Sequence, residues 1–266
     1  MKLLALINSD QAWVRWITSA IGLALGLALW EAVGWSFNPA FMAPFIGGEG
    51  HPGTAPRLYQ FMFDTEFHTS VISSLTLFLT GFAIAVVLAI PLGIILARLI
   101  WLRLSLETYI LVLYVTPMVA LIPFILSIMG FGFWPKVLVV VLFAFFPILY
   151  NTLEGARSVK QELLEVARSF RTTELAIWRD ILIPYTLPFA LTGIRQATGR
   201  ALVGMIAAEY FLSSSGLGKE IEVASRTFEM ASVLASILMV TFMGVVFMRL
   251  AQLLEQRYAR WRGVDK

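Results

Sequence analysis

The chain contains no cysteine and only two histidines, His51 and His68, among its 266 residues. Without cysteine, this chain can form no disulfide, no thiol nucleophile and no cysteine-bound metal or cluster. Both histidines lie outside the long apolar runs, so a haem bundle or a histidine-rich metal site is not expected. We therefore predict no metal site and no catalytic residue.

Charge is also scarce, because charged residues make up 14% of the chain and hydrophobic residues 59%, with a mean hydropathy of +0.81. A soluble domain is about half apolar and about a quarter charged. The composition indicates a polytopic membrane protein, and residues 1–266 suit one membrane domain. The net charge of +3 follows the expected membrane topology and is not a sign of nucleic-acid binding.

The apolar runs predict an all-α fold with six transmembrane helices, since one span needs about 20 mostly apolar residues. The first run has no cleavage site behind it and is expected to be an anchor, not a removed signal peptide. Prolines inside the spans are expected to bend their helices, as packing kinks or as flexing points for gating; they are Pro91, Pro117, Pro123 and Pro147. The predicted spans are 16–33, 71–97, 109–129, 133–152, 185–211 and 230–248.

Basic residues fix the expected orientation, because cytoplasmic segments carry an excess of lysine and arginine. Fourteen of the twenty lie in the segments on the side of the two termini, four lie on the other side, and two lie in the fifth span. We therefore expect a multi-pass protein of the inner membrane, surrounded by lipid, with both termini in the cytoplasm. The connection 34–67 is then external, and its glycines and prolines predict an irregular loop.

A charged segment, residues 154–183, interrupts the apolar chain and is expected in the cytoplasm. Its apolar residues recur at helical spacing, which predicts short amphipathic helices. Thr172 or Thr173 could cap the second of them, with Glu174 in its first turn and Arg171 as a weak supporting partner. The segment is either a solvated loop on the lipid headgroups or a docking element for a cytoplasmic partner.

The run Glu165-Val166-Ala167-Arg168-Ser169-Phe170, with Ile183-Pro184 downstream, resembles the EAA loop of ABC importer permeases. Val166 replaces the middle alanine of that motif, and Arg171 stands where the family usually has glycine, so the local backbone and the partner contact are expected to differ there. The resemblance implies that the ATPase-coupling residues are Glu165, Val166, Ala167, Arg168, Ser169, Phe170, Arg171 and Thr172.

A second block is similar to the fifth span and its exit in the nitrate, sulfonate and taurine type of permease. It comprises Gly193-Ile194-Arg195, Gly199-Arg200-Ala201, Ala207-Ala208-Glu209 and Ser214-Ser215-Gly216-Leu217-Gly218. The resemblance implies a type I importer transmembrane domain that works as a homodimer. It also implies two cytoplasmic ATP-binding subunits and an external or periplasmic substrate-binding protein as partners.

Three ionisable residues fall inside the fifth span, where such groups are costly and usually face protein or water. Arg200 either bonds a neighbouring span or lines the translocation path of an anion; Arg195 bonds a neighbour or extends toward the interface. Gly204 shares a face of small residues with Arg200, which allows close packing or lines a path. Glu209 is expected to order the turn at 213–218, with solute binding as the alternative. The candidate path residues are Arg200, Gly204, Arg195 and Glu209.

The predicted function is permeation of a small anion, such as a sulfonate, taurine, nitrate or an aromatic carboxylate, coupled to separate ATPases. The chain lacks the Gly-x-x-x-x-Gly-Lys-Ser/Thr loop, so it should bind no cofactor, and ATP and Mg²⁺ should be bound by the partner ATPase. The alternatives are an importer of a vitamin precursor such as a pyrimidine, or a secondary transporter. An integral-membrane enzyme would need a cluster of catalytic side chains at membrane depth, which the sequence lacks.

Overall fold

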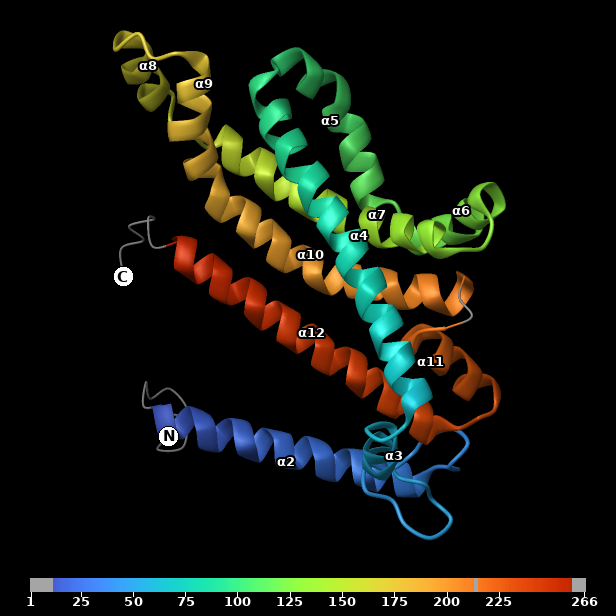
Figure 1. Ribbon diagram of the computed structural model, residues 1–266. Coiled ribbons are helices and arrows are strands. Elements are labelled where there is room, and N and C mark those ends of the chain that lie inside the picture. Colours follow the sequence, from blue (N-terminus) through green and yellow to red (C-terminus); the bar gives the residue numbers. More distant parts are fainter. Residues whose placement is uncertain (1–11, 213–214, 260–266) are drawn as a thin grey trace. The chain divides into compact units, whose positions relative to one another are not determined.

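The computed structural model describes residues 12–212 and 215–259, which are almost entirely helical (Figure 1). Within these ranges, the only strand-like pairing is an isolated bridge between Gly48 and His51. The predicted all-α fold is confirmed. The helices are α2 (Ala12–Ser36), α3 (Thr54–Phe61), α4 (Thr65–Arg98), α5 (Ile100–Val115), α6 (Ile122–Met129), α7 (Phe133–Arg157), α8 (Gln161–Ser169), α9 (Glu174–Ile177), α10 (Ile183–Leu212), α11 (Leu217–Arg226) and α12 (Met230–Ala259).

Among the described residues, four helices are long and apolar enough to cross a membrane: α2, α4, α7 and α12. A fifth span is possible if α5 and the segment 118–129 form one broken crossing. The predicted span 185–211 lies within α10, which carries three ionisable residues and does not meet the same criterion within the described residues.

The predicted span 109–129 is not one helix, and this is a correction to the sequence interpretation. α5 ends at Val115, a short 3₁₀ turn covers Met118–Leu121, and the two helical pieces are bent by 92°. Thr116 has extended backbone angles (φ −63°, ψ 132°), because the ring of Pro117 disfavours the helical region for the residue before it. Pro117 therefore ends a helix where a kink was expected.

Residues 69–212, 215–219 and 240–259 form one compact unit, whose core lies among α4, α7 and α10. Glycines allow these helices to approach closely: a Cβ on Gly81 of α4 would lie 2.6 Å from Val140, and one on Gly193 of α10 would lie 2.9 Å from Asn151. Pro91 and Pro147 lie inside α4 and α7, as predicted, and Pro123 lies in the first turn of α6. Close helix packing therefore sets the framework that carries the candidate site residues.

Residues 12–68 and 220–239 form a second unit, built by α2, α3 and the adjoining parts of α4, α11 and α12. The connection 34–67 was predicted to be irregular, but it contains α3 and an ordered loop. Glu31 of α2 accepts hydrogen bonds from the backbone N–H groups of Ile46 (2.7 Å) and Gly47 (3.2 Å) and from Trp35 Nε1 (2.8 Å). This carboxylate ties the loop to the end of α2.

Candidate functional site

The charged segment folds into two short helices, α8 and α9, as its amphipathic pattern predicted. Of the eight predicted coupling residues, Ala167 is buried, Thr172 is half-buried and the other six are exposed. The exposed residues include apolar side chains, with Phe170 81% exposed and Val166 55% exposed. We name the exposed apolar surface of these helices the coupling patch; it consists of Leu163, Val166, Phe170 and Leu175.

Arg171 closes the carboxyl end of α8 in a Schellman motif. Its own N–H donates to the carbonyl of Arg168 (2.8 Å), and the N–H of Thr172 donates to that of Ala167 (3.1 Å). The motif requires a left-handed residue, and Arg171 has a φ of +55°. The backbone thus adopts the conformation for which glycine is favoured, at a cost of roughly 1 to 2 kcal/mol for a residue with a Cβ. Compared with a glycine at this position, Arg171 adds an exposed cationic side chain and lowers the stability of the turn by this amount.

Glu174 connects the second coupling helix to the end of α4. The side chain of Thr173 caps α9 by accepting from the N–H of Ala176 (3.4 Å), as predicted. Arg98 Nη2 donates to Glu174 Oε2 at 2.7 Å, and Arg168 lies 4.0 Å from the same carboxylate. The predicted pair between Arg171 and Glu174 is wrong, because the left-handed turn ends α8 and places Glu174 in a separate helix.

Arg200 is exposed on α10 and lies against an aromatic pair. Its Nη2 donates to the hydroxyl of Tyr114 (3.2 Å), and its guanidinium lies 4.9 Å from the centre of the Tyr114 ring. The Tyr114 ring stacks on Tyr150 with centroids 5.8 Å apart. Helices α5, α7 and α10 therefore bring a cation and two aromatic rings together, which the sequence did not predict because the three residues are far apart in the chain.

Arg195 points to a different partner, Glu255 of α12. Its Nη1 lies 3.3 Å from Glu255 Oε2, while Thr192 Oγ1 donates to Glu255 Oε1 at 2.7 Å. This agrees with the prediction that Arg195 bonds a neighbouring helix. An ion pair and a hydrogen bond therefore link α10 to α12, and the Arg195 charge is compensated inside the unit.

Gly204 is a packing residue, since a Cβ there would lie 2.7 Å from the ring of Phe143 on α7. Of the two predicted alternatives, close packing and path lining, the geometry supports close packing. Arg200, on the same helix, is exposed, whereas Gly204 is buried.

Glu209 is fully buried and orders the turn that follows α10. Its carboxylate accepts from Ser74 Oγ at 2.7 and 2.8 Å and from the N–H of Gly218 at 2.9 Å. Ser74 Oγ also accepts from the N–H of Leu217 at 2.8 Å. These contacts at residues 217–218 agree with the predicted ordering role, whereas residues 213–214 lie outside the described part of the chain. These hydrogen bonds satisfy the Glu209 carboxylate without a bound solute.

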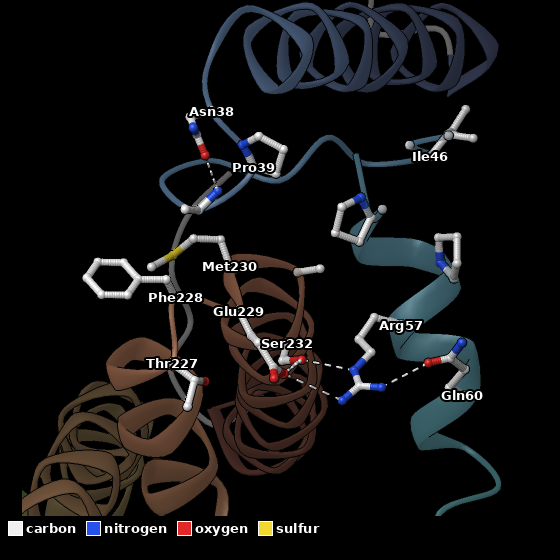
Figure 2. A pocket seen from close by; sticks show the side chains of 17 residues that line it. Asn38, Pro39, Ile46, Arg57, Gln60, Thr227, Phe228, Glu229, Met230 and Ser232 are labelled. Carbon is white, nitrogen blue, oxygen red and sulfur yellow. Dashed lines mark hydrogen bonds and ion pairs between the residues drawn. The ribbon is translucent and has the colours of Figure 1, made fainter. Parts of the chain in front are cut away.

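A pocket of about 980 Å³ lies between the connection 34–67 and the junction of α11 with α12 (Figure 2). Arg57 of α3 projects into it and donates from Nε to Ser232 Oγ (2.9 Å) and from Nη1 to Gln60 Oε1 (3.0 Å). Arg57 Nη2 lies 3.8 Å from Glu229 Oε2. The sequence interpretation missed this site. The one sequence feature that could have indicated it is that Arg57 is the only lysine or arginine of the connection.

A sequence model of one protein family matches residues 89–260, and its description is "binding-protein-dependent transport system inner membrane component". The matched range includes all the predicted site residues, which lie on α8, in the turn between α8 and α9, and on α10.

Several curated proteins are similar to the chain over most of its length. The riboflavin transport system permease protein RibX of Chloroflexus aurantiacus is 30% identical over 91% of this chain and 88% of its own length. The formylaminopyrimidine transport permease protein ThiX of Halalkalibacterium halodurans is 30% identical over 75% of this chain and 80% of its own. The putative aliphatic sulfonates transport permease protein SsuC of Bacillus subtilis is 32% identical over 68% of this chain and 66% of its own.

The fold is similar to that of a chain in a solved ABC transporter. In inward-facing structures of the MetNI methionine ABC transporter, one chain matches with a TM-score of 0.62 and 16% identity. The match covers 72% of the present chain and 95% of that chain.

Proposed function

The chain belongs to the family of binding-protein-dependent transport system inner membrane components, the permeases of ABC importers, and we propose that it conducts a small organic anion. In this proposal, two copies form the path in the inner membrane. Two ATPase subunits dock on the cytoplasmic segment α8–α9, and an external binding protein delivers the solute. ATP and Mg²⁺ are bound by the ATPases, so the chain itself is not an enzyme.

The coupling patch is the observation that carries the proposal. Four large apolar side chains are exposed on short helices rich in charge, with Phe170 and Leu175 each 81% exposed. Apolar surface that is clustered and rimmed by polar residues marks a site of protein interaction. An exposed aromatic residue in such a patch is a typical anchor for a partner. The patch therefore supports a docking role over a solvated loop.

The exposed face of α10 supports a path shared by two copies. Gln196, Arg200, Val203 and Tyr210 are exposed at spacings of three, four and seven residues, so they lie on one side of the helix. A guanidinium at membrane depth is costly unless it faces protein or water. A second permease copy would place this face beside a water-filled path and remove Arg200 from lipid.

Arg200 favours an anionic solute, because a guanidinium offers several donors to carboxylate or sulfonate oxygens. SsuC is named for aliphatic sulfonates, which agrees with this preference. The second candidate is a ring-bearing vitamin or vitamin precursor. It is favoured by the stacked rings of Tyr114 and Tyr150 beside Arg200, and by the names of RibX and ThiX.

The proposal is tested by reconstituting the chain in proteoliposomes with its ATPase and binding protein. Uptake of radiolabelled taurine, benzoate and riboflavin is measured with and without ATP. We expect uptake of at least one anion that requires both ATP and the ATPase. Arg200→Gln should lower that uptake about tenfold or more with assembly intact, since a hydrogen bond to a charged group contributes about 1.5 to 3 kcal/mol. Equal uptake without the ATPase would instead identify a secondary transporter.

A further inference from the structure

The pocket around Arg57 lies apart from α10 in sequence, and the transport path proposed above does not use it. Its wall is formed by the loop at 38–53, the start of α3 and residues 227–232, all within one compact unit (Figure 2). Its volume of about 980 Å³ falls within the range of about 300 to 1,000 Å³ that is usual for small-molecule sites. We propose that this pocket binds a small organic monoanion, with the charged group on Arg57 and the apolar body against the wall.

The guanidinium of Arg57 has more N–H donors than the hydrogen bonds it makes with the described residues. A guanidinium carries five N–H groups, and among the described residues two of those of Arg57 make hydrogen bonds, to Ser232 and Gln60. These two bonds, and the ring of Phe61 at 5.0 Å, hold the side chain in one orientation. The remaining donors are therefore positioned for a carboxylate or a sulfonate, which a guanidinium can bind through two parallel hydrogen bonds.

Apolar residues line other parts of the pocket, which suits the body of an organic anion better than an inorganic ion. The apolar lining includes Pro39, Ile46, Phe228 and Met230. Phe228 lies at the edge of the pocket with a φ of +59°, a left-handed conformation that a bulky residue rarely adopts. The ring is 57% exposed and contacts Phe41 edge to face at 6.2 Å. An exposed pair of rings of this kind offers contact area to an apolar ligand.

Glu229 acts against anion binding and makes the proposal specific. Its carboxylate lies 3.8 Å from Arg57 Nη2, which is too long for a hydrogen bond, and its side chain is 58% exposed. An ion pair this exposed contributes little. An incoming anion can therefore compete with Glu229 for the guanidinium, and removing the Glu229 charge should strengthen anion binding. A purely structural role of Arg57 predicts no such gain.

The place of this site on a transport route rests on the proposed function, which puts the connection 34–67 outside the membrane. The binding itself does not depend on that function. A site outside the membrane would hold a solute on the external side, on residues other than Arg200.

The test measures binding of benzenesulfonate to the purified full-length chain in lipid nanodiscs by ligand-observed NMR. The neutral isostere benzenesulfonamide is the matched probe. We expect saturable binding of benzenesulfonate, binding of benzenesulfonamide at least fivefold weaker, and a loss of affinity of about tenfold in Arg57→Gln. Glu229→Gln should bind benzenesulfonate about threefold more tightly. Arg226→Gln, in the same unit but outside the pocket, should bind like the wild type.

Equal binding of the two probes, unchanged affinity in Arg57→Gln, or weaker binding in Glu229→Gln would each overturn the proposal. If Arg57→Gln does not fold, two other variants decide the question. They are Arg57→Lys, which keeps the charge but loses the paired donors, and Glu229→Gln. Binding that is lost in Arg200→Gln and kept in Arg57→Gln places the anion on α10, and it overturns this site while leaving the proposed function intact. Failure of the proposed function is seen separately, as uptake that needs no ATPase.

Discussion

Phe170→Asp is expected to abolish docking of the ATPase subunits and, with it, ATP-driven uptake. The Phe170 ring is 81% exposed at the end of α8, so a folded chain does not need it for its own core. An aromatic anchor in the centre of an interface contributes about 2 kcal/mol or more, and a buried, unpaired carboxylate in its place adds a desolvation cost. The amount of ATPase that co-purifies with the chain should fall more than tenfold.

The control for this prediction is Phe170→Leu, which keeps an apolar side chain and should retain most of the docking. Both variants should resist heating as well as the wild type, because neither alters a buried contact. Normal co-purification of the ATPase with Phe170→Asp would show that the coupling patch is not the docking surface.

Glu209→Leu is expected to cause the largest loss of stability among substitutions in α10. The change leaves the hydroxyl of Ser74 and the N–H of Gly218 without their shared acceptor in a buried place. Each buried polar group left without a partner costs about 1 to 3 kcal/mol, so a total of about 3 kcal/mol is expected. The measurement is the fraction of chain that stays soluble in detergent after heating, which should fall at a lower temperature.

Ser74→Ala and the double variant identify the cause of that loss. Because Ser74 and Glu209 share one network, the two substitutions together should cost less than the sum of their separate effects. Glu49→Leu replaces an exposed carboxylate and should change stability by less than about 0.5 kcal/mol. A fully additive pair, or a Glu209→Leu chain as stable as Glu49→Leu, contradicts the role assigned to this carboxylate.

Local features were predictable from the sequence where one short segment determines them. The helices α8 and α9 follow from their apolar spacing, and the cap at Thr173 follows from the preference of its side chain. The break at Pro117 was predicted at the right place but with too small an effect. A kink assumes that the helix continues, whereas the extended Thr116 and the following turn redirect the chain by 92°.

Contacts between distant segments were not predictable, because no local pattern encodes them. The residues that pair with Arg195, Arg200 and Glu209 are Glu255, Tyr114 and Ser74, each at least 60 positions away. The sequence indicated that these charges need partners at membrane depth, and only the packing of the helices shows which partners they have. The pocket at Arg57 likewise depends on two segments that meet only in the folded chain.

The central claim is that the coupling patch contacts an ATPase in the cytoplasm, and a single-cysteine cross-link tests it most directly. The chain has no cysteine of its own, so Phe170→Cys supplies a unique thiol for a short cross-linker that also reacts with lysine. With the complex in native membranes, the account predicts a product that contains this chain and the ATPase. Phe41→Cys, on the opposite side in the proposed topology, should give no such product. A cross-link to the ATPase from position 41, and none from position 170, would contradict the account.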